Sequence, residues 1–295
     1  MNYRHAFHAG NFADVHKHSV LVRVLLHLRL KPTGFRVIDT HAGSGRYDLR
    51  GPEAARSGEW HQGIERLWRL GQSPAVHNLL RPYLDAVAAL NPDGELRYYP
   101  GSPLIAKGLL RAQDHLIACE LEPRSAAVLA AALRGDRRAK ALKIDGWRAA
   151  AAYVPPPERR GLVLIDPPFE ATDDFAHLSK VLASAHRKWP TGIYLLWYPI
   201  KDRQGPDALA RQLRRLSVPN VLRSELTLGT PRPEGGLAGS GLVVVNPPFT
   251  LERDLGALMP VLCRLLSSKA ASRTDWLIAE QNRGVPGNAS SIGLD

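Results

Sequence analysis

A carboxylate, two prolines and an aromatic ring stand together at Asp166, Pro167, Pro168 and Phe169. The apolar run 161–165 before them has the pattern of a buried strand. The prolines end that strand because neither can donate a hydrogen bond to a neighbouring one. Asp166 is therefore expected at the carboxyl end of a strand, where open α/β sheets bind ligands. An acid beside a flat apolar ring suits a planar ring that carries an exocyclic amine.

A glycine-bearing loop at 40–47 is the second feature with chemical potential. Gly43 and Gly45 allow the backbone to approach a ligand without a clash from Cβ. The loop is not a dinucleotide fingerprint, since Asp48 occupies the third glycine position, and it lacks the lysine of a phosphate-binding P-loop. An acid ahead of such a turn, here Asp39, is typical of enzymes that use S-adenosylmethionine, a cofactor without phosphate.

Three more strands are expected to end in acids, at Glu120, Asp145 and Asp166. With the glycine loop first, this order resembles that of S-adenosylmethionine-dependent methyltransferases, and Asp-Pro-Pro-Phe is similar to the signature of those that act on amino groups. In such a site Glu120 accepts hydrogen bonds from the ribose hydroxyls, Asp145 contacts the adenine amine, and Asp166 lies beside the reacting centre.

A related tetrapeptide, Asn-Pro-Pro-Phe, begins at Asn246. It follows one of the last expected strands and has no glycine loop downstream of it. Asp166, by contrast, ends the fourth strand counted from the glycine loop, near the point where the strand order of the sheet reverses. We therefore take Asp166 as the functional residue and interpret Asn246 as a structural strand terminator.

Apolar periodicity predicts the elements that must position these residues. Strands separated by helices indicate an α/β fold with a doubly wound, mostly parallel sheet. Two late strands, 220–228 and 241–246, have the spacing of an antiparallel hairpin. The other expected strands are 35–39, 116–120, 139–144, 162–165 and 192–198, and the expected helices are 13–30, 103–112, 123–134, 146–153, 172–188 and 205–216.

Breaks in this pattern predict the domain organisation. Residues 52–100 interrupt the alternation with helical patterns near 60–70 and 74–90, which indicates an inserted helical subdomain. The chain then divides into an N-terminal helical extension (1–34), a main domain (35–51 and 101–280), the insertion (52–100) and a flexible tail (281–295) rich in Gly, Ser and Asn.

The composition of the 295 residues favours a polyanionic partner, because the formal net charge is +11. A generally basic proteome is the alternative explanation. No apolar run approaches the roughly 18 residues of a membrane span. The N-terminus has no apolar signal region, so a cytoplasmic protein is expected. Two cysteines are too few for a cysteine-rich zinc site.

The segment from Tyr3 to His18 closely resembles the opening of the RlmJ family, bacterial enzymes that methylate N6 of one adenine, adenine 2030, in 23S ribosomal RNA. The likeness continues through 39–47, 97–103, 161–169 and 196–199, and it spans nearly the whole chain. It implies a Rossmann-like class I methyltransferase with an inserted helical subdomain, S-adenosylmethionine as cofactor, and no metal.

The resemblance also assigns site residues. Asp166 is implied as the catalytic acceptor, with Pro167 and Phe169 beside it. Tyr3, His5 and Lys17 would lie near the target adenosine. Phe169 departs from the more usual tyrosine, which keeps the stacking surface but loses a hydroxyl. The residues implied to meet the cofactor are His18, His41, Gly43, Ser102, Glu120, Asp145, Gly146 and Asp166.

Several alternatives remain open from the sequence. The histidines at 5, 8, 16 and 18 could bind a metal, although Asp14 is the only acid near them. Trp197 and Tyr198 could belong to the core or to the site. A DNA adenine methyltransferase and a nucleic-acid-binding protein without activity are the rival functions. We expect 23S rRNA that is not yet fully assembled as the substrate, because deeply placed bases become inaccessible in a mature subunit, and we favour a monomer.

Overall fold

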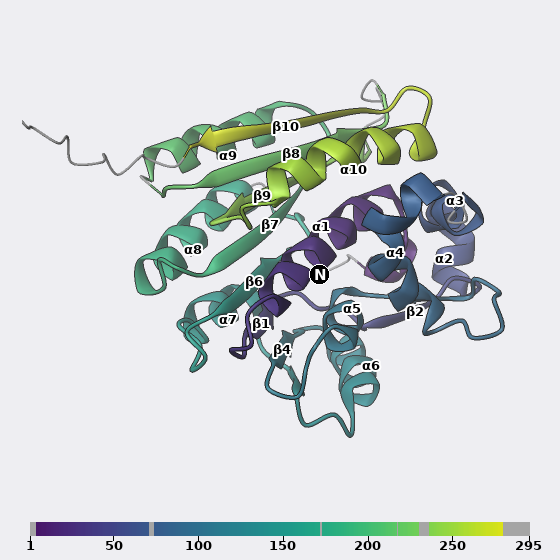
Figure 1. Cartoon of the computed structure of the whole chain (residues 1–295), viewed down its shortest axis with the longest axis horizontal. Coiled ribbons are helices and arrows are strands. Elements are labelled where there is room, and N and C mark those ends of the chain that lie inside the picture. The colour runs from purple at the N-terminus through teal and green to yellow at the C-terminus, as the bar shows by residue number, and fades with distance from the viewer. Residues whose placement is uncertain (1–3, 71–73, 172, 217, 230–235, 280–295) are drawn as a thin grey trace, which may run out of the picture.

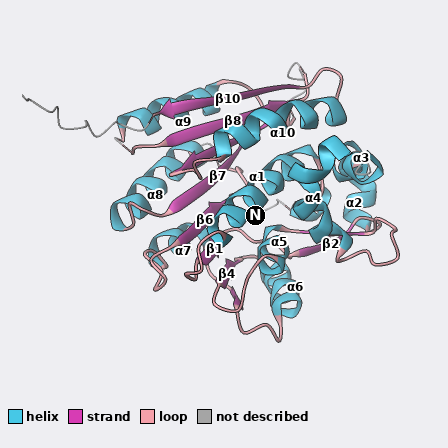
Figure 2. Ribbon diagram, viewed as in Figure 1, coloured by secondary structure: helices cyan, strands magenta, loops and turns pink. Residues whose placement is uncertain are grey.

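A mixed sheet of eight strands, covered by helices on both faces, forms the centre of the protein in the computed structural model (Figures 1 and 2). The structure describes residues 4–70, 74–171, 173–216, 218–229 and 236–279. The strands of the sheet are β1 (Arg36–Asp39), β4 (His115–Cys119), β5 (Ala139–Leu142), β6 (Gly161–Ile165), β7 (Ile193–Ile200), β8 (Val221–Thr227), β9 (Gly239–Val245) and β10 (Ala271–Ile278).

The strand order is β10-β8-β9-β7-β6-β1-β4-β5. Strands β5, β4, β1, β6 and β7 are parallel, as predicted. The predicted antiparallel pairing of β8 with β9 is also confirmed, and β9 lies between β8 and β7. The order reverses at β1, which has β4 on one side and β6 on the other, so the loops that follow these three strands meet at one edge of the sheet.

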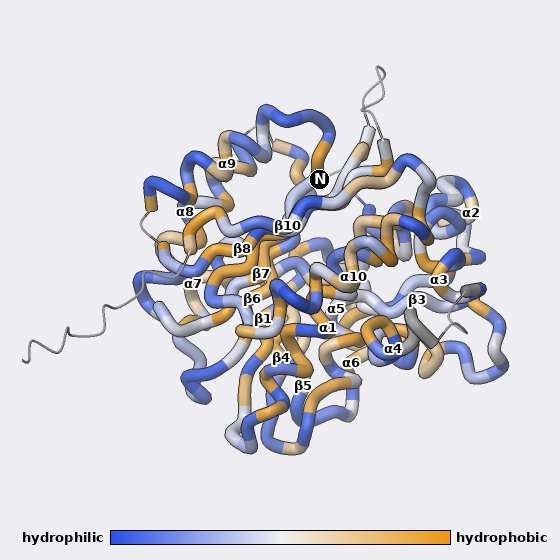
Figure 3. Tube along the Cα trace, turned by 45° about the horizontal axis from the view of Figure 1, so that its top comes forward, coloured by the Kyte–Doolittle hydropathy of each residue, from blue (hydrophilic) through white to orange (hydrophobic). Residues whose placement is uncertain are grey.

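The helices pack on the two faces of the sheet, and the central strands are hydrophobic along most of their length (Figure 3). Alternation sends Leu162 and Leu164 of β6 into one core and Val163 and Ile165 into the other. One face is covered by α1 (Phe12–Arg29), α5 (Ser102–Gly108), α6 (Pro123–Leu133) and α10 (Leu251–Leu266), and the other by α7 (Gly146–Ala152), α8 (Asp174–Lys188) and α9 (Gln204–Arg215).

The insertion contains the predicted helices together with a strand pair that the sequence did not predict. Residues Arg46–Asp48 (β2) and Tyr98–Pro100 (β3) form a two-stranded antiparallel ribbon. The sequence predicted a loop over 40–47 and no strand between 52 and 100. The ribbon closes the two ends of the insertion against each other. The helices between them are α2 (Pro52–Ser57), the 3-10 turn η2 (Glu59–Gln62), α3 (Ile64–Leu70) and α4 (Pro74–Ala88).

Helix α1 is the element that connects the insertion to the sheet. It packs against α4 of the insertion and against β6 and β9 of the sheet, and it runs between these parts in Figure 1. Its start is fixed by Asn11, whose Oδ1 accepts hydrogen bonds from the amides of Ala13 (2.9 Å) and Asp14 (3.0 Å). Within the described ranges, no helix has the length and apolarity needed to cross a membrane.

Candidate active site

Two cavities meet at Asp166, at the carboxyl end of β6. The first has a volume of about 630 Å³ and extends over the ends of β1, β4 and β5. The second, of about 770 Å³, lies on the side of β7. Both are lined by His5, Lys17, Asp166, Pro168 and Glu170. The acid of the tetrapeptide is therefore part of a wall that two separate ligands could share.

The first cavity brings together the residues that the resemblance assigned to the cofactor. All eight line it: His18, His41, Gly43, Ser102, Glu120, Asp145, Gly146 and Asp166. Of the other predicted site residues, His5 and Lys17 line both cavities and Phe169 lines the second. Pro167 is buried and lines neither cavity, so the carbonyl contact expected of it stays a prediction. Tyr3 lies outside the described residues.

The Glu120 carboxylate holds the glycine loop by hydrogen bonds to backbone amides. Its Oε2 accepts a hydrogen bond from the amide of Gly43 (2.9 Å), and its Oε1 accepts one from the amide of Glu122 (2.8 Å). Gly43 has a φ of +61°, and a Cβ at this position would overlap Tyr47 Oη. Tyr47 Oη in turn accepts from the amide of Ser44 (3.0 Å). Both the conformation and the space at this turn therefore require glycine.

Asp39 acts on the cavity through Ser102. The Ser102 hydroxyl donates to Asp39 Oδ2 (2.6 Å), while Asp39 Oδ1 is buried and has no hydrogen-bond partner among the described residues. Burial raises the pKa of Asp39 to about 7, although the hydrogen bond from Ser102 opposes the shift. Asp39 does not line the cavity itself, so its effect there is to fix the Ser102 hydroxyl, which does.

The far end of the first cavity is formed by the start of α7. Asp145 Oδ1 caps this helix by accepting from the amide of Arg148 (3.0 Å). A Cβ on Gly146 would collide with the Thr40 carbonyl and lie 2.6 Å from His41 Nε2. Trp147, which the sequence analysis did not single out, packs edge to face on His41 with ring centroids 5.1 Å apart. An indole and an imidazole thus form an apolar edge beside two acids.

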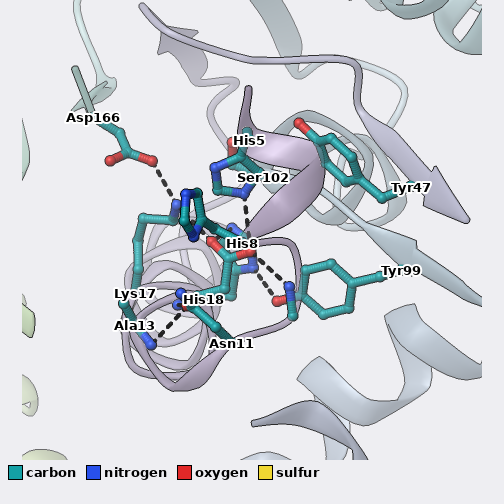
Figure 4. A network of polar contacts seen from close by, with 12 residues as sticks. His5, His8, Asn11, Ala13, Lys17, His18, Tyr47, Tyr99, Ser102 and Asp166 are labelled. Atoms are coloured by element: carbon teal, nitrogen blue, oxygen red, sulfur yellow. Dashed lines mark hydrogen bonds and ion pairs between the residues drawn. The ribbon is translucent and has the colours of Figure 1, made fainter. Parts of the chain in front are cut away.

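A buried ion network joins α1 to the tetrapeptide (Figure 4). Lys17 Nζ lies 2.5 Å from Asp166 Oδ2 and 2.8 Å from Asp14 Oδ1. Asp14 Oδ2 also accepts from the amide of Gly10 (2.9 Å) and pairs with His5 Nε2 (3.0 Å). The side chains of Lys17 and Asp14 are only 5% and 2% exposed, so water screens these charges little.

The network fixes the charge of its members. Burial alone would lower the pKa of Lys17, but the charges of Asp14 and Asp166 outweigh it and raise that pKa. Burial alone would raise the pKa of Asp14, but His5 and Lys17 outweigh it and hold that pKa well below its usual value. Lys17 is therefore an ammonium ion and Asp14 a carboxylate. Asp14 was named from the sequence only as the acid near a metal site, and its spacing of three residues before Lys17 was the signal for this pair.

A second polar chain runs from the insertion to His18. Tyr83 Oη lies 2.8 Å from Tyr99 Oη, which lies 2.6 Å from His18 Nδ1. Burial lowers the pKa of His18 to about 3, so the ring is neutral. We assign the order Tyr83 to Tyr99 to His18 Nδ1, because the reverse order would leave the buried Tyr83 hydroxyl without an acceptor. His18 Nε2 then carries the proton on a ring that lines the first cavity.

Tyr83→Phe should therefore destabilise the protein by about 1 kcal/mol, since it removes the first donor of this chain without opening a large cavity. Urea unfolding followed by circular dichroism measures the change. The matched control is Tyr153→Phe, which removes a hydroxyl from a half-buried tyrosine outside the chain. Equal stability of Tyr83→Phe and the wild type would contradict the assigned order.

The four N-terminal histidines bond to four different sets of partners. His5 pairs with Asp14, and His8 pairs with Glu59 (3.0 Å). His16 bonds to two serines, and His18 bonds to Tyr99. In the described part of the chain, no three His, Cys, Asp or Glu side chains are grouped so that they could hold a metal ion. The histidines thus serve hydrogen-bond networks that position α1.

Phe169 and Trp197 give the second cavity its aromatic surface. Phe169 has a φ of +51°, a conformation that L residues rarely adopt, and its ring packs on Phe175 with centroids 4.8 Å apart. The sequence left open whether Trp197 and Tyr198 belong to the core or to the site, and the structure separates the two residues. Tyr198 is a core residue, only 1% exposed, whereas Trp197 is half-buried and lines the cavity.

Asn246 has a structural role, as predicted. Its Nδ2 donates to the carbonyls of Pro190 (2.8 Å) and Gly192 (2.8 Å), which ties the end of β9 to the turn before β7. Asn246 lines neither cavity, and the Phe249 of this tetrapeptide is 84% exposed. The two similar tetrapeptides are therefore used differently by the fold.

Comparison with known proteins shows which family this chain is similar to. The family model "Ribosomal RNA large subunit methyltransferase D, RlmJ" matches residues 32–278. The chain is 40% identical over 282 residues to Ribosomal RNA large subunit methyltransferase J of Escherichia coli (strain K12), covering 95% of this chain and 100% of that relative. It is 39% identical over 283 residues to the protein of the same name from Haemophilus influenzae, with the same coverage.

A solved structure agrees with this relationship. The crystal structure of protein LPL1258 from Legionella pneumophila superposes with a TM-score of 0.84 at 32% identity, covering 91% of this chain and 98% of that one. Sequence and structure therefore agree along nearly the whole length. The chain belongs to the family of ribosomal RNA large subunit methyltransferases described as RlmJ.

Proposed function

We propose that the protein transfers a methyl group from S-adenosylmethionine to N6 of an unpaired adenine in large-subunit ribosomal RNA. The observation that carries this proposal is the position of Asp166 on the wall shared by the two cavities. One cavity has the acids and glycines suited to a nucleoside cofactor, and the other has aromatic rings suited to a base. The family relationship and the net charge of +11 favour RNA as the source of that base.

The first cavity fits the cofactor on its own chemistry. Glu120 and Asp145 offer carboxylate oxygens to ribose hydroxyls and to an adenine amine, and Trp147 offers an apolar edge. At the opposite end, the Ser102 hydroxyl, which Asp39 holds in place, suits an amino-acid head group. Gly43 and Gly146 line the cavity, and their Cβ positions are occupied by Tyr47 and by Thr40 with His41, so the cavity wall is closely packed there. When bound, S-adenosylmethionine supplies an electrophilic methyl group on a sulfonium.

Asp166 and Phe169 act on the acceptor base. Lys17 bonds to Asp166 Oδ2, so we assign Oδ1 to the N6 amine. Asp166 Oδ1 and the Pro167 carbonyl would each accept one of the two N6 hydrogens. Together they would aim the nitrogen lone pair at the methyl carbon. As the new N–C bond forms, the carboxylate stabilises the positive charge that develops on nitrogen and can take the departing proton. Phe169 would stack on the base, which must be unpaired or flipped out.

Lys17 cannot be the proton acceptor, because its raised pKa keeps it an ammonium ion. Its role is to hold Asp166 in position and in the charged form. Asp14 in turn holds Lys17, since both side chains belong to α1 and are one helical turn apart. His5, which lines both cavities and pairs with Asp14, lies close enough to contact a bound nucleotide. This arrangement supports the assignment of His5 and Lys17 to the substrate region, which the resemblance implied.

Transfer of labelled methyl groups tests the function directly. The protein is incubated with labelled S-adenosylmethionine and with purified 23S rRNA, assembled large subunits or genomic DNA. We expect label on the naked rRNA, less on assembled subunits, and N6-methyladenine after digestion and mass spectrometry. Label on DNA alone would replace the proposal with a DNA methyltransferase. No transfer and no heat of cofactor binding would leave a non-catalytic nucleic-acid-binding protein.

Gly146→Ala tests the assignment of the first cavity. The added Cβ meets the Thr40 carbonyl and the His41 ring, so α7 must shift away from the cavity wall. We expect cofactor affinity, measured by calorimetry, to fall at least about tenfold, equivalent to about 1.4 kcal/mol. Gly256→Ala is the matched control, because nothing lies within 4 Å of the added Cβ in α10. Unchanged affinity in Gly146→Ala would place the cofactor elsewhere.

A further inference from the structure

Trp197 is the large aromatic residue of the second cavity to which neither the sequence nor the resemblance assigns a role. It lies near the carboxyl end of β7, the strand next to β6, which ends at Asp166. Its neighbours on β7 are turned into the opposite core, where Tyr198 bonds to Glu225. Trp197 instead packs on the α1 side of the sheet and lines the cavity together with Phe169 and Pro199.

The two aromatic rings form a corner. The Phe169 and Trp197 ring centroids are 5.8 Å apart, and the ring planes meet at 73°. Because the two rings are not parallel, a base cannot be sandwiched between them. A planar base can stack on Phe169 and place its edge against the face of Trp197. Such a corner fixes both the plane of the base and its rotation within that plane, which is what aims N6 at Asp166.

A buried hydrogen-bond chain fixes the orientation of the indole. Trp197 Nε1 lies 3.0 Å from Ser240 Oγ, which lies 3.0 Å from His16 Nδ1, and His16 Nε2 lies 2.9 Å from Ser224 Oγ. Indole N–H can only donate, so Ser240 Oγ accepts from Trp197. The proton of the Ser240 hydroxyl is then available to His16 Nδ1, and we assign His16 Nε2–H as the donor to Ser224. Ser240, His16 and Ser224 are each completely buried, so the chain has no competing water.

This hydrogen-bond chain starts at His16 on α1, the helix that also carries Lys17 and His18. Three consecutive residues of α1 point in three directions, about 100° apart around the helix axis. His16 reaches Trp197 through Ser240, Lys17 reaches Asp166, and His18 reaches the cofactor cavity and Tyr99. One rigid helix therefore sets the relative positions of the second cavity, the reacting carboxylate and the first cavity.

We propose that Trp197 is the second wall of the target-base site, where it selects a purine and orients its N6, and that Ser240 and His16 are positioning residues for Trp197. This inference rests on the proposed function and extends it to the residue that recognises the base. A purine stacked on Phe169 makes the larger contact with the corner because its second ring extends beyond the phenyl ring, whereas a pyrimidine only matches the phenyl ring in size.

Kinetics of Trp197 variants test the proposal. Trp197→Ala should raise the KM for 23S rRNA about tenfold, as expected when a base loses one aromatic contact, and should lower kcat because N6 is less well aimed. Trp197→Phe should recover most of the KM, since it keeps an aromatic face. The matched control is Trp276→Ala, a half-buried indole on the edge strand β10 that lines neither cavity. Cofactor affinity should stay unchanged in all three variants.

Ser240→Ala separates positioning from folding. It leaves the indole in place but removes its acceptor, so kcat should fall several-fold while the thermal unfolding temperature changes little more than for Ser179→Ala. Ser179 is a matched control, because it is a buried serine whose hydroxyl lies on α8, away from both cavities. An equal kcat for Ser240→Ala and wild type would overturn the positioning role.

Fluorescence gives a readout that general destabilisation does not produce. Oligoadenylate added to the wild type should quench tryptophan emission, oligouridylate should not, and Trp197→Phe should lose the adenylate response. Cofactor-induced quenching should persist in Trp197→Phe and disappear in Trp147→Phe, because Trp147 lines the other cavity. If the wild type methylates rRNA but Trp197→Ala has a normal KM and a normal adenylate response, the inference is wrong. If the wild type transfers no methyl group, the proposed function fails first.

Discussion

Asp166→Ala should lower methyl transfer to 23S rRNA by about 10²–10³-fold, the loss typical of removing one preorganised group that stabilises developing charge. The change removes the acceptor for N6 and the group that could take its proton. It leaves Lys17 paired with Asp14, so no isolated charge remains in the interior. RNA affinity should change less than about twofold, because most of the binding free energy comes from phosphate contacts elsewhere on the basic surface. Single-turnover kinetics with saturating cofactor measure the transfer step itself.

Two companion variants identify the cause of the loss. Asp166→Asn keeps a carbonyl acceptor but no negative charge, and it should be intermediate in activity. Asp202→Ala removes an exposed acid in the loop after β7 that lines neither cavity, and this variant should be as active as the wild type. Transfer by Asp166→Ala within tenfold of the wild type would show that another group accepts the amine hydrogens, and the assignment of this tetrapeptide would be withdrawn.

The parts of this fold that the sequence predicts are those set by local patterns. Three of the five parallel strands, β1, β4 and β6, are short apolar runs that end at or directly before Asp39, Glu120 and Asp166, and a run of this kind is readable without tertiary information. The last helix and strand, α10 and β10, were not assigned. Helix α10 has apolar residues at helical spacing, but it carries Pro260 in its interior, which argues against a helix in a reading of the sequence. Strand β10 lies at the edge of the sheet with polar residues over most of its length, so it lacks the apolar pattern of a strand.

The ribbon β2–β3 was missed for a different reason. Its two strands are three residues long and are separated by the whole insertion, so only the folded insertion brings Tyr47 opposite Tyr99. Pairing over such a sequence distance leaves no local signal. The consequence for the site is considerable, because Tyr99 of β3 is the residue that bonds to His18.

The site shows the same division between local and long-range information. The acids and glycines of the first cavity follow strands, and their meeting at one edge is a consequence of parallel topology. The networks that hold them are long-range, since Lys17 meets Asp166 across 149 positions and His16 meets Ser240 across 224. Periodicity predicts that α1 is a buried helix, but it cannot say which polar residue of that helix meets which strand. The role of Trp197 therefore emerges only from the structure, whereas the spacing of Asp14 and Lys17 signals their pair but not its link to Asp166.

Lys17→Met should be the most destabilising single change in the site, at about 3–5 kcal/mol of unfolding free energy. It leaves two carboxylates, Asp14 and Asp166, facing the space in which the ammonium group lay. Asp14→Asn should be milder, about 1–3 kcal/mol, because it removes one hydrogen-bonded charge and leaves the pair of Lys17 and Asp166 electrically balanced. Urea denaturation at pH 7.5 provides both values, and transfer assays on the folded fraction should show activity lost in Lys17→Met.

The double variant Asp14→Asn with Lys17→Met separates charge balance from function. One carboxylate remains instead of two, so the double variant should be more stable than Lys17→Met alone, yet it should be equally inactive because nothing holds Asp166. Stabilities that simply add would contradict direct coupling between Asp14 and Lys17.

The pH dependence of Lys17→Met should have the opposite sign to that of the wild type. In the wild type the pKa of Asp14 lies well below its usual value, so its contribution to stability is complete above the unfolded-state pKa of about 3.9 and is lost only as the pH falls through the lower folded-state value. In Lys17→Met the two carboxylates repel, which raises their folded-state pKa values. The folded state then binds more protons than the unfolded state, and the variant gains stability as the pH falls from 8 towards 5. A stability deficit that stays constant over this range would mean that the two carboxylates move apart when the ammonium group is removed.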